Sequence, residues 1–387
     1  MSLIKGIKCV APVFDRSGYA EWSRNYILAL SRSGLPITVE PVSFDKQMDV
    51  NSSPELQEIN SLRHNSMDYN VVICWLIPPA AASVFKHQKS DAFKVLFTLW
   101  ETTELPNGWP QLINDSVDEC WLAGEWSKEV FKNSGVTAPM KGFSYPINFD
   151  HYNIDASVIN RPFSEDTYLF YFISQWTERK NFSDLLEAYW SEFSKEDNVA
   201  LLIKTHISSN SEQESDYLAK VIKSIKDKGD YGSTSPVVLL TEMFSNEQIL
   251  ALHKISDCYV SPSRGEGLGL GILEAGLFGN TVISNSFGEQ SSYISSNSAH
   301  VYGHTLRPVT GMNNPFYTSE QYWCQPDVYG MAKAMRKAYE ERKSSRRGNN
   351  LKAYLKKKCS YSKVASDIKH SLNNSLEKYY SASGENR

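Results

Sequence analysis

A glycine-rich segment that carries two glutamates is the part of this chain best suited to chemistry. Residues 261–275 read Ser-Pro-Ser-Arg-Gly-Glu-Gly-Leu-Gly-Leu-Gly-Ile-Leu-Glu-Ala. An apolar run ends at Ser261, and a helix is predicted to begin near Leu270. Glycines let a ligand approach the backbone closely and tolerate positive φ. Because the free N–H groups and the dipole at a helix start suit a phosphate or sugar oxygen, the segment predicts a binding loop.

The two carboxylates of this segment are spaced for separate tasks. Glu266 lies in the loop before the predicted helix, and Glu274 lies in the second turn of that helix. Carboxylates placed in this way can accept hydrogen bonds from two different sets of hydroxyls. The alternative is an ordinary Rossmann-type turn with a capping glutamate. A glycine-rich loop alone would fit that alternative equally well, but the paired glutamates favour a binding site.

The elements that must position this segment begin with an alternation of strands and helices. The apolar run 7–13 predicts a buried strand, the amphipathic stretch 21–33 a helix that Gly34 terminates, and 37–42 a second strand. This order is typical of the opening βαβ unit of a doubly wound sheet. Further strands are predicted at 71–77, 94–99, 119–123 and 140–145, and a helix at 127–134.

A second alternating set follows a polar stretch. Residues 148–165 have no apolar periodicity, so we expect the domain linker there. The pattern then restarts, with strands at 168–173, 199–203, 237–240, 258–261 and 281–284 and helices at 181–193, 214–226, 246–254, 270–278 and 327–342. We therefore predict two α/β domains, 1–155 and 160–355. The helix 361–380 has a free apolar stripe, and we expect it to cross back and pack on the N-terminal domain.

Composition narrows the class of protein. Of the 387 residues, 41% are hydrophobic and 22% charged, which is enough to bury a core in each domain. The net charge of −4 gives no overall drive towards nucleic acid, so none is expected as a partner. The basic run 336–358 is interpreted as a solvated helix face and loop, with contact to an anionic membrane or polyanionic acceptor as the alternative.

The cysteines and the apolar runs indicate in which cellular compartment the protein is expected. The six cysteines form no C-x-x-C pair, and several lie inside apolar runs, so we expect buried, reduced packing residues of a cytoplasmic protein. Lys5 and Lys8 interrupt the only apolar stretch near the N-terminus, which argues against a signal peptide. No run reaches the roughly 18 apolar residues of a membrane span. Any membrane contact would therefore be peripheral, at the inner face of a membrane.

Residues 261–275 resemble the E-x7-E motif of the retaining glycosyltransferases of family 4, group 1, which have the GT-B fold. The flanks 246–257 and 279–284 are similar to the same family. Residues 97–102 and 119–135 resemble the last third of its N-terminal domain, and 174–181 the phosphate loop that opens its C-terminal domain. The resemblance covers residues 5–380. It implies an α/β fold of two Rossmann-like, doubly wound domains that face a cleft.

The resemblance also implies which residues hold the donor. Lys180 matches the lysine that binds the donor diphosphate in this family. The family's arginine usually comes earlier, where this chain has Gln175, and Arg179 is interpreted as its substitute. An arginine and a lysine would neutralise a departing diphosphate, although a solvated, charged helix start is the alternative. Lys204, at the end of a predicted strand, is a further candidate for donor binding.

The two glutamates of the motif are expected to bind different parts of the donor. The resemblance implies that Glu266 reaches the transferred sugar and that Glu274 reaches the ribose hydroxyls of the nucleotide. The residues between them that complete the donor-binding set are Gly267, Leu268 and Gly269.

Two residues of the N-terminal half complete the candidate site. Gly18 resembles the glycine loop that packs against the diphosphate from the other side of the cleft, with an ordinary helix-entry glycine as the alternative. Many relatives carry a histidine near the reacting sugar, and no histidine of this chain falls at a matching position. Glu101, just past a strand end, occupies roughly that region. It would face the acceptor, or serve as a capping or structural carboxylate.

The resemblance implies a retaining glycosyltransferase that moves a sugar from a nucleotide diphosphate sugar to an acceptor hydroxyl on a glycan, a lipid-linked saccharide or another polymer. The implied front-face mechanism uses no protein nucleophile, because the leaving phosphate helps to deprotonate the acceptor. No D-x-D motif or carboxylate–histidine cluster argues for a metal, and no cofactor is expected. The alternatives are a non-catalytic nucleotide-sugar-binding protein of this fold and another GT-B enzyme, such as a phosphorylase or an epimerase.

Overall fold

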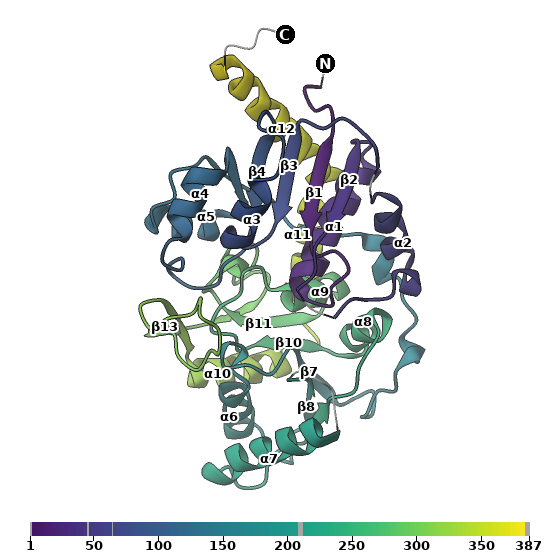
Figure 1. Cartoon of the computed structure of the whole chain (residues 1–387). Coiled ribbons are helices and arrows are strands. Elements are labelled where there is room, and N and C mark those ends of the chain that lie inside the picture. The colour runs from purple at the N-terminus through teal and green to yellow at the C-terminus, as the bar shows by residue number, and fades with distance from the viewer. Residues whose placement is uncertain (1, 45, 64, 208–211, 384–387) are drawn as a thin grey trace. The chain divides into compact units, whose positions relative to one another are not determined.

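The chain forms two compact units (Figure 1). The computed structural model describes residues 2–44, 46–63, 65–207 and 212–383. Unit 1 comprises Met1–Trp100, Glu104–Phe149 and Lys357–Arg387, whereas unit 2 comprises Glu101–Thr103 and Asp150–Lys356. The C-terminal segment thus returns to the unit in which the chain begins, and a short piece of the N-terminal half belongs to unit 2.

Unit 1 is built on a parallel sheet of six strands in the order β2-β1-β3-β4-β5-β6. Every residue of β3 is buried, as expected for an inner strand of a parallel sheet that is covered on both faces. The strands are β1 (Ile7–Ala11), β2 (Ile37–Pro41), β3 (Val71–Trp75), β4 (Phe93–Phe97), β5 (Glu119–Leu122) and β6 (Met140–Gly142). The helices that connect them are α1 (Gly18–Arg32), α2 (Pro54–Ser61), α3 (Pro78–Phe85), α4 (Trp109–Ser116) and α5 (Glu125–Asn133).

The last helix, α12 (Tyr361–Ser383), packs within unit 1, where it contacts α1. Its apolar stripe is fully covered; the buried residues are Val364, Ile368, Leu372 and Leu376. Polar contacts fix the same helix to β5, because Ser375 Oγ donates to Glu119 Oε1 at 3.1 Å. The Glu119 carboxylate is buried and also pairs with Lys141 at 2.9 Å. The apolar stripe of α12, for which the sequence showed no partner, is therefore part of the core of unit 1.

Unit 2 has a second parallel sheet of six strands, in the order β12-β11-β10-β7-β8-β9. The strands are β7 (Tyr168–Ile173), β8 (Val199–Lys204), β9 (Val237–Leu240), β10 (Cys258–Ser261), β11 (Thr281–Asn285) and β12 (His300–Tyr302). Its helices are α6 (Phe182–Glu192), α7 (Glu212–Lys228), α8 (Asn246–Ile255), α9 (Leu270–Phe278), α10 (Val328–Glu340) and α11 (Arg347–Lys358). The strand order reverses between β7 and β10. Open α/β sheets bind ligands beyond the carboxyl ends of the strands at such a reversal.

An antiparallel hairpin interrupts the alternation in unit 2, and the sequence pattern did not predict it. Its strands are β13 (His304–Pro308) and β14 (Tyr322–Pro326). The side chains of Trp323 and Cys324 are buried, and Cys324 N donates to Arg264 O at 2.8 Å. Thr103 N donates to Tyr322 O at 2.8 Å. The hairpin therefore braces the glycine-rich segment and holds the piece Glu101–Thr103 in unit 2.

Two expectations about the whole chain can be compared with the structure. Each of the six cysteines is a buried free thiol, as their apolar surroundings predicted. In the ranges that the structure describes, no helix combines the length and the apolar character needed to cross a membrane.

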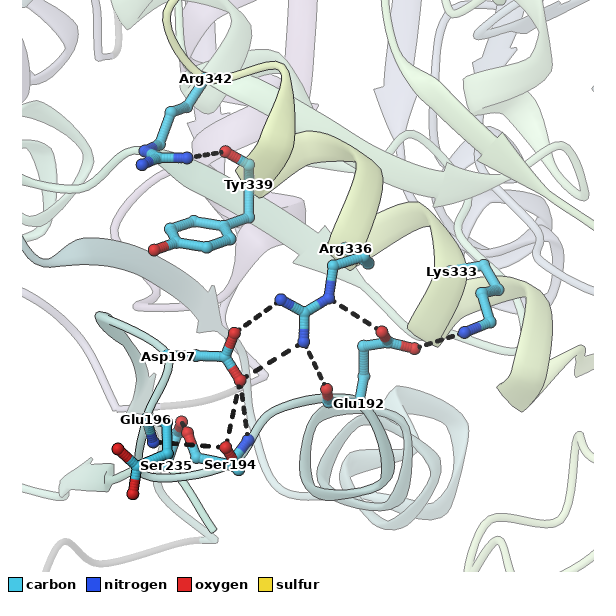
Figure 2. A network of polar contacts seen from close by, with 9 residues as sticks. All are labelled: Glu192, Ser194, Glu196, Asp197, Ser235, Lys333, Arg336, Tyr339 and Arg342. Atoms are coloured by element: carbon cyan, nitrogen blue, oxygen red, sulfur yellow. Dashed lines mark hydrogen bonds and ion pairs between the residues drawn. The ribbon is translucent and has the colours of Figure 1, made fainter.

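Arg336 of α10 ties together three segments of unit 2 (Figure 2). Its guanidinium donates to Glu192 Oε1 at 2.9 Å, to the Glu192 carbonyl at 2.6 Å and to Asp197 Oδ1 at 2.6 Å. The same group lies 4.4 Å from the ring centroid of Phe193. Arg336 opens the basic run that the sequence indicated as a solvated face. At this residue that interpretation is wrong, because acidic partners and an aromatic ring cover the guanidinium.

We predict that Arg336→Ala lowers the free energy of unfolding by about 1 to 2 kcal/mol, because two acidic groups lose a charged, partly buried donor. Lys333→Ala is the matched control, since Lys333 binds the same Glu192 carboxylate at 3.0 Å but is half exposed. The control should change stability much less. Urea denaturation of both variants measures the difference, and equal losses would contradict the packing role of Arg336.

Candidate functional site

The two loops singled out in unit 2 lie at the carboxyl edge of its sheet. β7 ends at Ile173, and the segment with Arg179 and Lys180 follows it. β10 ends at Ser261, and the glycine-rich segment follows. β7 and β10 are parallel neighbours, so both loops leave the same edge of the sheet side by side. Two segments separated by about eighty residues of sequence are thereby brought into contact at the reversal of strand order.

Backbone and arginine hydrogen bonds fasten these two loops together. Arg264 N donates to Arg179 O at 2.8 Å, and the Arg264 guanidinium donates to Glu178 O at 2.6 Å. In the opposite direction, Arg179 Nη1 donates to Gly265 O at 2.7 Å. Each loop thus supplies an arginine side chain that donates to a backbone carbonyl of the other loop. These bonds fix the relative position of the two loops.

Asn181 shapes the turn that presents the basic pair. Its φ of 56° is the only positive value at a non-glycine residue in the described part of the chain, and asparagine is among the few residue types that tolerate it. Its side-chain amide donates to Asp184 Oδ2 at 2.7 Å and to Pro262 O at 3.2 Å. Arg179 and Lys180 therefore lie in a short 3-10 turn, Glu178–Lys180, that is clamped at its end.

Two cations and two carboxylates form the centre of the site. Lys180 Nζ lies 2.6 Å from Glu266 Oε1, and Arg179 Nη1 lies 3.7 Å from Glu266 Oε2. Arg179 Nε lies 3.2 Å from Glu101 Oε1, which also accepts a hydrogen bond from Tyr317 Oη at 2.5 Å. The side chains of the four charged residues are 11 to 20% exposed. The charges are therefore largely shielded from bulk water.

Burial and the neighbouring charges act in opposite directions on the pKa values in this cluster. Burial alone would raise the pKa of Glu266, but attraction to Lys180 and Arg179 outweighs it and holds that pKa below its usual value. Burial lowers the pKa of Lys180, with repulsion from Arg179 adding to it and Glu266 opposing it. For Arg179, the effect of burial is outweighed by Glu101, Tyr317 and Glu266, so its pKa is raised. The cluster holds two charges of each sign, so an incoming anion must compete with carboxylates for the cations.

Glycines are required where this loop turns and where it passes other backbone. A Cβ on Gly265 would lie 2.2 Å from the carbonyl oxygen of Glu101. Gly269 has a φ of 80° directly before α9, and Tyr293 Oη donates to Leu268 O at 2.6 Å. Gly267 lies between these points and is partly exposed. The loop that carries Glu266 is therefore held in one shape from both sides.

The remaining predicted residues lie outside this cluster. Glu274 is in α9, where its Oε2 lies 3.2 Å from His253 Nε2. Lys204 ends β8; it is buried, its Nζ lies 5.2 Å from the centroid of the Phe244 ring, and burial lowers its pKa. Gly18 is the first residue of α1 and belongs to unit 1. Within unit 2, the structure thus brings Arg179, Lys180, Glu266 and Glu101 together and places Glu274 and Lys204 outside this cluster.

Several residues of the site had no sequence signal of comparable strength. Tyr317 lies 216 positions from Glu101, and nothing local to either residue links them. Arg264 stands within the motif, but its role in joining two loops depends on the sheet order. Asn181 follows the basic pair directly, and only its identity as an asparagine indicates a left-handed turn in the sequence. Across the described ranges, no group of three His, Cys, Asp or Glu side chains is arranged to hold a metal ion.

The family comparison matches the part of the chain that contains most of this site. Residues 155–305 match the model of a family described as glycosyl transferases group 1. This range contains both loops, the basic pair and both glutamates, although it is less than half of the chain. A search of curated protein sequences finds no match.

Solved structures share the fold across nearly the whole chain. Sucrose-phosphate synthase from Thermosynechococcus elongatus is 13% identical, with a TM-score of 0.68 over 97% of this chain and 100% of that one. HepE from Anabaena in complex with UDP is 12% identical, with a TM-score of 0.63 over 95% and 100%. An Escherichia coli trehalose-6-phosphate structure bound with UDP-2-fluoro glucose is 11% identical, with a TM-score of 0.60 over 95% and 98%. The chain therefore has the two-domain α/β fold of GT-B glycosyltransferases, which confirms the predicted fold class.

We predict that Gly265→Ala lowers the free energy of unfolding by about 1 to 3 kcal/mol, because the new methyl group would overlap the Glu101 carbonyl. Gly303→Ala is the control, since a Cβ there would make only an ordinary contact, 3.7 Å from Asp327. Thermal melting of the two purified variants measures the difference. Equal melting temperatures would show that Glu101 does not pass this close to the loop.

Proposed function

We propose that the chain is a retaining glycosyltransferase that moves a sugar from a nucleotide diphosphate sugar to the hydroxyl of a carbohydrate or lipid-linked acceptor. The observation that carries the proposal is the pairing of Lys180 and Arg179 with Glu266 beside the glycine-rich loop of unit 2. The match of residues 155–305 to glycosyl transferases group 1 supports it. The similar structures of HepE with UDP and UDP-glucose make UDP-glucose the first donor to test.

Donor binding would proceed as an exchange of anions. In the structure, the Glu266 Oε1 atom lies 2.6 Å from Lys180 Nζ. A diphosphate carries more negative charge and more acceptor oxygens than one carboxylate, so it would take over Lys180 and Arg179. Glu266 would then be released to accept hydrogen bonds from the sugar hydroxyls beside the glycine N–H groups. The ion pair between Lys180 and Glu266 would thus give way when the donor binds.

The transfer step would need no protein nucleophile. The bond between the anomeric carbon and the phosphate oxygen breaks, and its electron pair stays on the nucleoside diphosphate. The acceptor oxygen bonds to the anomeric carbon from the same face, and its proton passes to the leaving phosphate oxygen. Lys180 and Arg179 stabilise the charge that develops on that phosphate. Because the protein supplies two cations there, we propose a reaction without a metal or a cofactor.

The other predicted residues take supporting parts in this proposal. Glu101 would orient Arg179 through their contact at 3.2 Å, in place of the acceptor-facing role expected from the sequence. Glu274 would bind the nucleotide ribose. Gly18 and Lys204 stay predictions as donor-binding residues.

We predict that Lys180→Ala lowers the turnover number about a hundredfold, the effect of removing one preorganised charge-stabilising donor, with a smaller change in donor affinity. Arg179→Ala should behave similarly if Arg179 serves the same diphosphate. Lys195→Ala is the control, because Lys195 is an exposed lysine of the same unit. Release of UDP from UDP-glucose in the presence of acceptor sugars is the measurement.

A normal turnover number of Lys180→Ala would show that Lys180 takes no part in the mechanism. Loss in Lys180→Ala together with normal turnover in Arg179→Ala would show that Arg179 does not substitute for the family's arginine.

Variants of the two glutamates should differ in their affinity for UDP. Glu274→Ala should weaken UDP binding roughly 10- to 150-fold, because a hydrogen bond to a charged acceptor is lost. Glu266→Gln should bind UDP at least as tightly as the wild type, since Lys180 then has no competing carboxylate, while turnover falls. Calorimetric titration with UDP measures both. Similar loss of UDP affinity in the two variants would contradict the division of the donor between them.

A further inference from the structure

Glu274 has a neighbour that the proposed function does not use. Its Oε2 lies 3.2 Å from Nε2 of His253, which is fully buried at the end of α8. The Glu274 side chain itself remains 25% exposed. One oxygen of this carboxylate is therefore held from inside the protein, while the side chain as a whole stays partly exposed.

A chain of buried hydrogen bonds determines which atom of His253 carries the proton. The Asn280 amide nitrogen donates to the His253 carbonyl oxygen and, at 2.8 Å, to Tyr171 Oη. The carbonyl can only accept, which fixes the orientation of the Asn280 amide. Tyr171 Oη accepts from Asn280, so its own hydrogen is free to be donated to His253 Nδ1, 2.7 Å away.

This order of donation assigns the ring hydrogen of His253 to Nε2. Burial raises the pKa of Tyr171 well above its usual value, so the hydroxyl keeps the proton that it donates to Nδ1. Because Nδ1 accepts, Nε2 must carry the ring hydrogen and point it at Glu274 Oε2. The order of donation is Asn280 to Tyr171, Tyr171 to His253, and His253 to Glu274.

Stacking fixes the plane of the imidazole in this chain. The ring is parallel to that of Phe278 in α9, with an interplanar angle of 1° and centroids 6.0 Å apart. It also stacks with Tyr259 of β10 at 6.0 Å and 26°. Since the ring cannot turn without disturbing both neighbours, the direction of the Nε2–H group is set by the core of unit 2.

We infer that His253 is a positioning residue, which holds one oxygen of Glu274 so that the exposed part of the carboxylate is presented to the ribose hydroxyls of a nucleoside diphosphate. This inference rests on the proposed function. A free glutamate side chain would lose rotational freedom when it binds a nucleotide, whereas a side chain already held by His253 loses less. His253 therefore acts on nucleotide affinity through Glu274.

The test is calorimetric titration of the full chain with UDP, with ADP and GDP run beside it. His253→Leu should weaken binding about tenfold, the value of one hydrogen bond to a charged group. His253→Gln retains an amide N–H near the position of Nε2 and should recover most of that loss. The turnover number at saturating donor should change less than the donor KM, because His253 does not touch the reacting atoms.

A double-mutant cycle separates positioning from general damage to the core. In the Glu274→Ala background, His253→Leu should cause no further loss of UDP affinity. An equal loss with and without Glu274 would overturn the inference, because His253 would then act through packing alone. Tyr171→Phe removes only a hydroxyl and should show the same dependence on Glu274. If His253→Leu does not fold, Tyr171→Phe is measured in its place.

The remaining outcomes distinguish this inference from the function on which it rests. If the wild type binds none of the three nucleotides, the proposed function fails and the inference fails with it. If the wild type binds UDP and His253→Leu binds it equally well, the inference alone fails. Nitrogen NMR of histidine-labelled, ligand-free protein gives a readout that needs no nucleotide. A hydrogen on Nδ1 of His253 would also overturn the inference.

Discussion

The ion pair between Lys180 and Glu266 is the interaction on which the rest of the site depends. It joins two loops that are distant in sequence and adjacent only because β7 and β10 pair at the reversal of strand order. The bonds of Arg179 and Arg264 to carbonyls of the opposite loop, and the left-handed turn at Asn181, hold the partners at this distance. The hairpin β13–β14 braces the same loop from outside. Much of the local structure of unit 2 therefore keeps two opposite charges together in a poorly solvated place.

The two glutamates of the motif lie in different surroundings, although one short loop and one helical turn separate them. Glu266 faces two cations, and their attraction keeps its pKa low despite burial. Glu274 faces the buried ring of His253, whose Nε2–H group is directed by Tyr171 and Asn280. A carboxylate held by two cations can be displaced from them by a stronger anion, whereas one held by a fully buried ring keeps its place. This contrast is the physical basis for assigning them to different parts of a donor.

The sequence predicted most of the elements and the central charged residues, because those depend on local patterns. The run from Leu270 to Phe278 was predicted as a helix with the same bounds that the structure has, since glycines with positive φ flank it. The hairpin β13–β14 was missed, because it breaks the strand and helix alternation and its strands are partly exposed. The contacts of Tyr317 with Glu101 and of His253 with Glu274 could not be predicted, since each depends on which elements become neighbours after folding.

A crystal structure of the chain with UDP shows directly whether a diphosphate replaces Glu266 on Lys180. We expect the terminal phosphate oxygens to lie within hydrogen-bond distance of Lys180 Nζ and the Arg179 guanidinium. Glu266 should have left Lys180, and the ribose hydroxyls should contact Glu274, still held by His253. UDP bound while the Lys180–Glu266 pair stays closed, or UDP bound away from the glycine-rich loop, would contradict the account.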